Sequence, residues 1–323
     1  MKFINHLFVI AVLSTFTLAA NGQSTGTTAD SNQKIVVITG NRFAYKIIQK
    51  WIDEYNKVSP GVQIIIEARG TNDPAKFQIL AEVYPQDEEI RKKREYVYIG
   101  RYAILPVSTS KSEFAKYYSE KGLDSELLKQ IFFNDIYADK ENQKAIKAPY
   151  TVYTRLQKAG APFVFTNYFG YQQKDIKGNA IAGADEHLVK AVLRDSTGVT
   201  YLPLTLIYDQ QTRKPIEGLT VLPVDYNGNG KVTDDEKFYT DLDKVIEQLE
   251  AKEPGAIKNI PMEYLHLSVD RQTATAEAID FLKWVNENGH QYLHEFGYLF
   301  SEPNQSEKEK FNDFASKRKS ESR

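Results

Sequence analysis

Short β-branched apolar runs alternate with amphipathic helical segments along the chain, and this alternation limits the fold more than any other feature. Residues 35–38 (Ile-Val-Val-Ile) and 63–67 predict buried strands, and residues 44–57 between them predict an amphipathic helix. A further helix is expected over 74–83. Strands that alternate with helices in this way are typical of parallel α/β sheets.

Two long β-rich segments divide the alternating pattern. Residues 96–107 form a run longer than most single strands, and residues 262–269 predict a second strand. With a continuous block between them, they predict two α/β lobes joined by two crossover strands: lobe I from 34–105 and 262–302, and lobe II from 106–261. Other expected helices cover 112–121, 125–132, 162–169, 184–194 and 274–288, and other expected strands cover 200–208 and 218–224.

The N-terminus has the pattern of a secretory signal peptide. Lys2 is followed by an apolar run from Leu7 to Leu18 and by the small residues Ala19 and Ala20. We therefore expect a signal peptide over 1–22 and a flexible leader over 23–33. The chain has no cysteine, so it has no disulfide and no lipobox cysteine. This favours a periplasmic or otherwise exported protein that is not a lipoprotein.

Charge and motif content exclude several functions. The chain has 41 Lys and Arg against 43 Asp and Glu, scattered among each other, so no nucleic-acid surface is indicated. It has no nucleophile elbow, P-loop or H-E-x-x-H motif, and we expect no enzymatic activity. The charged segment 303–323 is expected to be a solvated helix or a disordered tail.

Residues 225–236 match a twelve-residue EF-hand-like calcium loop. Such a loop needs oxygen ligands at positions 1, 3, 5, 7, 9 and 12 and a glycine at position 6, here Gly230. Only two side-chain ligands are anions, so we expect a weak Ca²⁺ affinity of roughly 10⁻⁴ to 10⁻³ M and an exiting helix over 234–250. The alternative is an Asn/Gly-rich turn without an ion. The ligands would be the side chains of Asp225, Asn227, Asn229, Thr233 and Glu236 and the carbonyl of Lys231.

Several short motifs occur in a shared order that resembles a known family. They are residues 38–45 with 51–55 and 60–62, residues 127–133, 155–165 and 198–201, and the segment 278–298. Together they resemble the phosphate-binding proteins of bacterial ABC uptake systems and the wider periplasmic-binding-protein family. The resemblance covers about residues 34–302, with the calcium loop as an insertion in lobe II. It implies a two-lobed periplasmic-binding-protein type II fold.

The resemblance also implies that an oxyanion binds between the lobes. Amides at helix N-termini and an arginine would hold it, because orphan N–H donors and the helix dipole favour negative charge. Arg155 could contact two anion oxygens at once. Alternatively, Arg42 and Arg69 are surface charges and Arg155 is a structural ion-pair partner. The candidate anion-binding residues are Gly40, Asn41, Arg42, Phe43, Arg69, Gly70, Thr71, Arg155, Gly160 and Ala161.

The loop that follows Arg155 departs from the family pattern. Where the family has Asp, Ser and Thr, this chain has Gln157, Ala159 and Ala161, which removes one carboxylate and two hydroxyls. The carboxylate matters for selectivity, since it accepts a hydrogen bond from hydrogen phosphate but repels sulfate. Either other groups complete the site, for example Arg42, Arg69, Thr71 and Tyr153, or the ligand is not free phosphate.

These expectations lead to two hypotheses of function. The first is an exported, soluble, monomeric solute-binding protein that delivers a small oxyanion, with phosphate favoured, to an inner-membrane ABC transporter permease. The second is a ligand-free, calcium-stabilised envelope scaffold or adhesion component on the same fold. The geometry of the cleft separates them, because a binding protein needs its arginines and loop amides to converge.

Overall fold

The structure is a computed structural model that describes residues 34–67, 69–71, 73–134, 143–157, 160–253, 255–300 and 305–321. The predicted signal peptide (1–22) and leader (23–33) lie outside the described residues.

One half of the described chain is built on a mixed sheet in the order β2-β1-β3-β9-β4. Strands β1, β2 and β3 are parallel, and β9 runs antiparallel to both β3 and β4. Helices α1 and α9 pack against each other, with the rings of Tyr55 and Phe281 5.2 Å apart. The bounds are β1 Lys34–Gly40, α1 Tyr45–Val58, β2 Val62–Ile66, β3 Ile79–Glu82, α2 Glu88–Arg91, β4 Arg94–Thr109, β9 Met262–Asp270 and α9 Ala276–Asn288.

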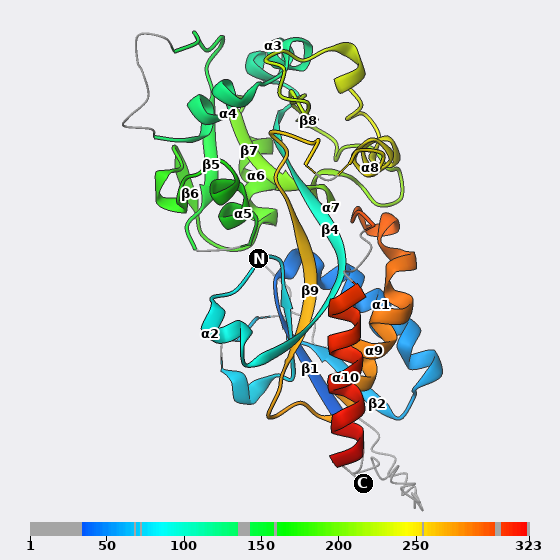
Figure 1. The fold of residues 1–323 in the computed structure, drawn as a ribbon. Helices are drawn as coiled ribbons and strands as arrows, with labels where there is room; N and C mark the ends of the chain where they lie inside the picture. Colours follow the sequence, from blue (N-terminus) through cyan, green and yellow to red (C-terminus); the bar gives the residue numbers. More distant parts are fainter. Residues whose placement is uncertain are drawn as a thin grey trace, which may run out of the picture. The chain divides into compact units, whose positions relative to one another are not determined.

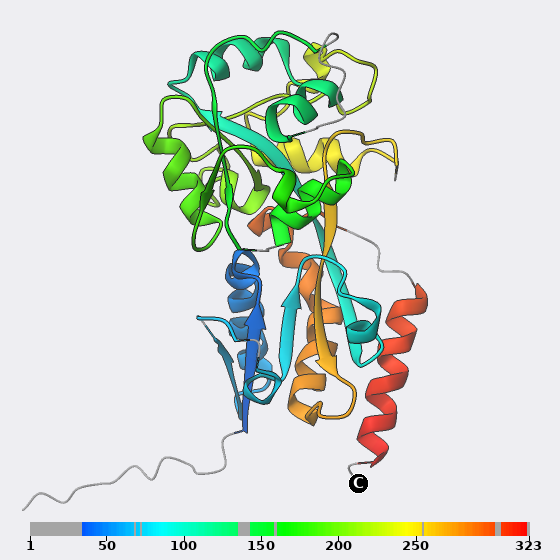
Figure 2. The same cartoon turned by 90° about the vertical axis from the view of Figure 1, so that its left-hand side faces the viewer.

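Strand β4 continues into the other half, as Figures 1 and 2 show. Its residues 94–103 pair with β9, whereas residues 104–109 pair with β7 and β8. Beyond β7 the sheet continues through β5 to β6, with parallel pairing. The bounds are α3 Glu113–Lys121, α4 Ser125–Phe132, β5 Thr151–Arg155, α5 Gly160–Tyr168, β6 Asn179–Ile181, α6 Glu186–Arg194, β7 Gly198–Pro203, α7 Leu204–Ile207, β8 Leu219–Val221 and α8 Leu242–Glu250.

Three predicted elements differ from the structure. The expected helix over 74–83 is a 3-10 turn, Pro74–Lys76, followed by strand β3, because Ile79 and Ala81 are buried between β1 and β9. The strand expected over 200–208 stops at Pro203, and α7 follows. The helix expected over 234–250 is a 3-10 turn, Asp234–Glu236, and α8 begins only after its N-cap Asp241.

The C-terminal segment forms helix α10, Gln305–Glu321, which packs on the first half. Phe311 on this helix is 1% exposed, and the Nη2 of Arg318 donates to the carbonyl of Gln272 at 2.6 Å. The segment is therefore a helix with one buried face, not the fully solvated helix or disordered tail expected from its charge.

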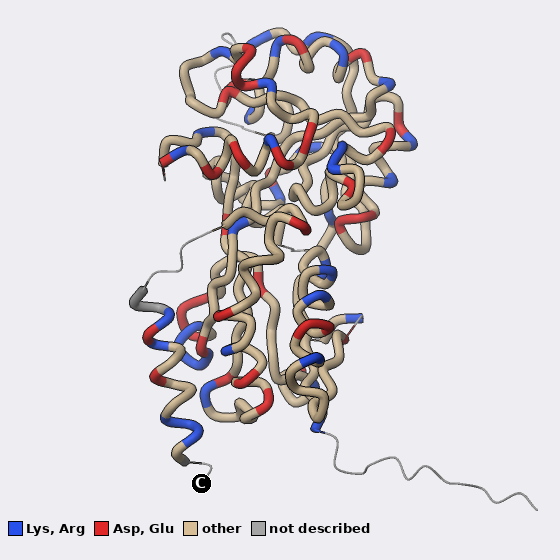
Figure 3. Tube along the Cα trace, turned by 90° about the vertical axis from the view of Figure 1, so that its right-hand side faces the viewer, with Lys and Arg blue, Asp and Glu red and all other residues tan. Residues whose placement is uncertain are grey.

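The surface carries no dominant charge in the described chain. Figure 3 shows basic and acidic residues interspersed in both halves and along α10. Within the described residues, no helix combines the length and the apolar character that crossing a membrane requires.

Candidate functional site

A cavity of about 510 Å³ lies where the carboxyl ends of strands from the two halves meet. Strands β1 and β3 end at it from one side, and β5 ends at it from the other. Ligands of open α/β sheets bind outside the carboxyl ends of the strands, so this is the expected place for a site. The cavity is lined by Gly40, Asn41, Arg42, Arg69, Gly70, Leu80, Ala81, Glu82, Val83, Tyr84, Gln86, Arg155, Gln157, Gly160, Gly183, Ala184 and Asp185.

Seven predicted anion-binding residues line this cavity: Gly40, Asn41, Arg42, Arg69, Gly70, Arg155 and Gly160. The other three, Phe43, Thr71 and Ala161, are not among the described residues that line it. Phe43 is buried against the ring of Tyr102 and Ala161 is 1% exposed. The hydroxyl of Thr71 accepts from Asp73 N.

The turn between β1 and α1 places Gly40 against strand β3. Gly40 has φ 131°, and a Cβ at this position would lie 2.0 Å from the carbonyl oxygen of Ala81, so only glycine fits. The amide of Asn41 donates to that same oxygen at 3.0 Å, and the amide of Phe43 donates to the Asn41 side chain at 3.3 Å. The two amides were expected to face an anion, but both already donate hydrogen bonds within the protein.

Arg42 and Arg69 lie together on the first half of the cavity wall. The Nη2 of Arg42 donates to the carbonyl of Arg69 at 3.1 Å, and both residues are exposed. The hydroxyl of Tyr45 donates to the carbonyls of Gly40 (3.1 Å) and Glu67 (3.3 Å), which joins the two arginine-bearing turns. This wall therefore presents two positive charges to the solvent-facing side of the cavity.

Arg155, at the end of β5, faces the cavity from the second half. Its Nη1 donates to Asp185 Oδ1 at 3.2 Å, with the two side chains 15% and 4% exposed. Burial raises the pKa of Asp185, and Arg155 acts in the opposite direction. The Nε of Arg155 is buried and has no hydrogen-bond partner among the described residues. Arg155 therefore forms the structural ion pair that one interpretation expected. It also keeps an unpaired Nε donor, which the anion-binding interpretation requires.

Asp185 was missed by the sequence interpretation, although it is the N-cap residue of α6 and its carboxylate pairs with Arg155. Gln157 stands where the resemblance predicted an Asp, and its Oε1 accepts from Gly183 N at 3.2 Å. It therefore braces the segment that carries Asp185. Tyr153, considered as a further ligand, donates to Asp195 at 2.8 Å, and Ala159 lies outside the described residues.

The two halves touch at Gly160, the first residue of α5. A Cβ on Gly160 would lie 2.1 Å from Val83 Cγ2 and 2.6 Å from Asn41 Nδ2. Beside this contact, the rings of Tyr84 and Phe163 are 4.7 Å apart. The hydroxyl of Tyr102 donates to the Val83 carbonyl at 2.6 Å and holds that wall in place. The structure thus shows the halves closed against each other at one edge of the cavity.

Glu82 adds a buried carboxyl group to the wall formed by β3. Its Oε2 accepts from Ser268 Oγ at 2.6 Å, and that same Oγ accepts from Arg94 Nε at 2.8 Å. Burial raises the pKa of Glu82 to about 7, although Ser268 and Arg94 act to lower it. Burial also lowers the pKa of His266, whose Nε2 is 3.9 Å from the Glu82 carboxylate, to about 3. The sequence interpretation missed Glu82 because it placed this segment in a helix.

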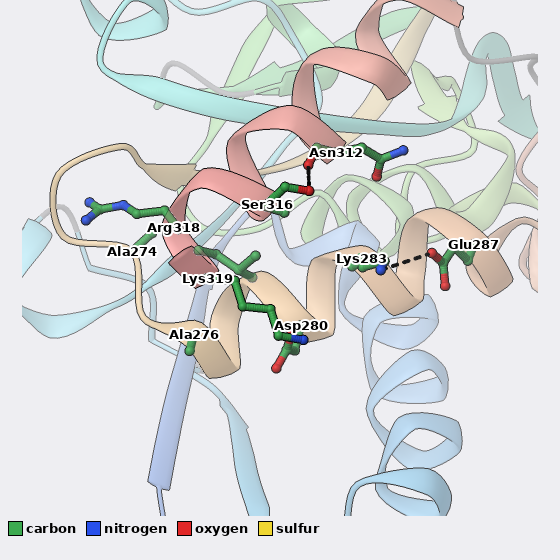
Figure 4. Close-up of a pocket in the computed structure, with 11 residues that line it drawn as sticks. Ala274, Ala276, Asp280, Lys283, Glu287, Asn312, Ser316, Arg318 and Lys319 are labelled. Atoms are coloured by element: carbon green, nitrogen blue, oxygen red, sulfur yellow. Dashed lines mark hydrogen bonds and ion pairs between the residues drawn. The ribbon is translucent and has the colours of Figure 1, made fainter. Parts of the chain in front are cut away.

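A second cavity of about 330 Å³ lies between α9 and α10, as Figure 4 shows. Its wall carries mixed charges, including an ion pair between Lys283 and Glu287 at 3.9 Å. Since it lies between two helices and away from the strand ends, the cavity lined by Arg155 is the stronger candidate site.

Comparisons with known proteins identify the fold. No protein-family model matches the chain, and no curated protein matches it either. A phosphate ABC transporter substrate-binding protein from Clostridium perfringens, solved with bound phosphate, has a TM-score of 0.59 at 14% identity, covering 83% of this chain and 100% of that one. An ABC-type phosphate transport receptor from Vibrio cholerae has a TM-score of 0.55 at 12% identity, covering 83% and 100%. The chain has a mixed α/β fold of the periplasmic-binding-protein type II kind.

Proposed function

We propose that this chain is an exported solute-binding protein that captures a small oxyanion, phosphate first, and delivers it to an ABC transporter permease. The observation that carries the proposal is the placement of Arg42, Arg69 and Arg155 on one cavity, from both halves of the fold. The buried, unpartnered Nε of Arg155 points to a missing acceptor, since buried donors are nearly always hydrogen-bonded. The two solved structures compared above are described as a phosphate ABC transporter substrate-binding protein and an ABC-type phosphate transport receptor, which supports phosphate as the first ligand to test.

Asp185 gives the proposed site a means of selecting its anion. A buried carboxylate beside the ligand accepts a hydrogen bond from hydrogen phosphate but repels sulfate, which has no proton to donate. In this chain Asp185 would perform that role from the start of α6, because Gln157 holds the adjacent segment in place. We therefore expect phosphate to bind more tightly than sulfate.

The direct test is calorimetric titration of the full-length chain with phosphate, sulfate and a phosphonate. The proposal expects saturable binding of phosphate with a micromolar or lower Kd, and weaker binding of sulfate. Absence of heat with all three anions would refute it and favour the ligand-free envelope scaffold.

Closure at Gly160 gives a second prediction. Gly160→Ala is expected to weaken phosphate binding about tenfold, because the added methyl group overlaps Val83 Cγ2 and wedges the closed halves apart at a cost of roughly 1–3 kcal/mol. The affinity measured by calorimetry should fall while the melting temperature of the ligand-free chain changes little, since alanine suits a helix better than glycine.

The matched control is the double variant Gly160→Ala/Val83→Ala, which removes the Val83 Cγ2 methyl group that the new alanine side chain would overlap. It should recover most of the lost affinity. Equal affinities for the single variant and the wild type would show that this contact does not form in the liganded state.

A further inference from the structure

The segment Asp225–Glu236 lies between β8 and α8, and its two end carboxylates are buried. Asp225 is 1% exposed and Glu236 is 0% exposed. An ordinary surface turn leaves its acidic side chains in water, because an uncompensated buried carboxylate is costly. The burial of these two residues therefore needs a cause.

Both carboxylates point into the same loop. Asp225 accepts from the amides of Gly228 (2.8 Å), Asn229 (3.0 Å) and Gly230 (2.8 Å). Glu236 accepts from Asn227 N at 3.3 Å and from the amide and hydroxyl of Thr233 at 2.9 and 3.0 Å. Because residues 227 and 228 are neighbours, the two carboxylates lie close together inside the loop. Among the described residues, no Lys, Arg or His forms an ion pair with either one. The amides of the loop solvate both carboxylates, but among the described residues no basic side chain balances their two negative charges, and a bound cation would do so.

The remaining groups of the loop offer only oxygen. Asn227 and Asn229 are exposed on the loop, and Thr233 caps the 3-10 turn that carries Glu236. Nowhere in the described residues do three or more His, Cys, Asp or Glu side chains form a metal-binding group, so a metal here would rely on amide, hydroxyl and carbonyl oxygens beside two carboxylates. A set of this kind suits a hard cation that accepts many oxygen ligands.

We infer that this loop is a calcium site, with ligands from Asp225, Asn227, Asn229, Thr233, Glu236 and the Lys231 carbonyl. This inference does not depend on the proposed function, since the loop residues do not line the cavity with Arg155. It selects the calcium loop over the ion-free turn that the sequence left open.

The loop is joined to the chain segment that returns to the crossover strand β9. Asn259 Nδ2 donates to the Asp225 carbonyl at 2.7 Å, and Lys258 N donates to the Tyr226 carbonyl at 2.5 Å. Val232, the apolar residue at position 8, packs against Gly122 at the end of α3. A Cβ added to Gly122 would lie 2.2 Å from Val232 Cγ2. Calcium would therefore fix α3, the loop and the start of β9 to one another.

The test is differential scanning calorimetry and calcium titration of the full-length chain. After chelation, 5 mM Ca²⁺ should raise the melting temperature by about 3 °C, as expected for a ligand with a sub-millimolar Kd, and equal Mg²⁺ should raise it less. Equal shifts with both ions, or no shift and no binding heat, would overturn the inference.

Two variants and a control locate the effect. Glu236→Gln and Asn229→Ala should each abolish or strongly reduce the calcium shift, and the exposed Asn229 gives a readable result even where Glu236→Gln does not fold. Asp234→Asn removes an acidic side chain that is 97% exposed and lies outside the ligand positions, and it should keep the full shift. Retention of the shift in Asn229→Ala and Glu236→Gln would place the ion elsewhere and overturn the assignment.

Discussion

Replacing Arg155 with alanine is expected to lower the phosphate affinity of the full-length chain at least about 100-fold. A hydrogen bond to a charged group contributes about 1.5–3 kcal/mol, and the guanidinium can supply more than one. The variant also leaves the buried carboxylate of Asp185 without its partner at 3.2 Å, so that it repels an anion in the same cavity. Calorimetric titration with phosphate measures the loss.

Loss of a buried partner also destabilises the fold, so binding must be separated from folding. Removing one member of a buried ion pair costs about 3–5 kcal/mol because the other charge stays buried, and the partial exposure of Arg155 reduces that figure here. The double variant Arg155→Ala/Asp185→Asn removes the orphaned charge and should recover most of the stability. It should still bind phosphate weakly, because the donor is absent.

The phosphate affinity of the double variant distinguishes an anion-binding role of Arg155 from a purely structural one. If the double variant binds phosphate as tightly as the wild type, Arg155 is only the structural partner of Asp185 and the proposed anion contact is wrong. Arg194→Ala is the matched control, since this exposed arginine lies at the far end of α6, the helix that begins beside Asp185. It should leave the affinity unchanged.

The longest periodic elements could be predicted from the sequence. The structure confirms the strands at 35–38, 63–67 and 262–269, the helices at 44–57 and 274–288, and the long strand over 96–107. Each has a buried face whose spacing is visible in the chain. The similar solved structures confirm the α/β fold class as well. This class could be predicted because the order of the strands and helices leaves few other arrangements.

Short elements were predicted poorly because tertiary pairing determines them. Strand β3 has only four residues, and its apolar run fits a helix or a strand equally well until β1 and β9 lie on either side of it. Strands β5 and β6 were not predicted for the same reason.

The candidate site shows the same limit. The sequence pointed to Arg155 through a motif, but it could not show that Asp185, from a separate helix, lies 3.2 Å away. It also could not show that the amides of Asn41 and Phe43 are already hydrogen-bonded within the turn. Partners that are distant in sequence decide which predicted donors are free, and no local pattern records them.

The carboxyl group of Glu82 is expected to make stability depend on pH in a way that one substitution isolates. Its pKa is raised to about 7 in the folded chain, against about 4.5 for a free glutamate. The folded state therefore binds an extra proton between these values, and this contribution to stability is present below pH 4.5 and lost as pH rises through 7. The loss amounts to about 2.5 kcal/mol between pH 5 and pH 8.

The wild-type profile alone conceals this effect because His266 acts in the opposite direction. Burial lowers the pKa of His266 to about 3, so its contribution to stability is present above pH 6.5 and is lost as pH falls. The two contributions nearly cancel between pH 5 and pH 8. The free energy of unfolding must therefore be compared between the wild type and Glu82→Gln at each pH. The contributions of His266 and of all other titratable groups then cancel in the difference.

Glutamine resembles the protonated carboxyl group, so in urea unfolding Glu82→Gln should exceed the stability of the wild type by about 1 kcal/mol at pH 5 and by about 3 kcal/mol at pH 8. A variant that is less stable than the wild type by the same amount at every pH would contradict the prediction. That result would mean that Arg94, through Ser268, keeps Glu82 ionised in the folded chain. The wall of the cavity would then carry a fixed negative charge, and at neutral pH the three arginines would face two full carboxylates, whereas a pKa of about 7 leaves Glu82 only about half ionised.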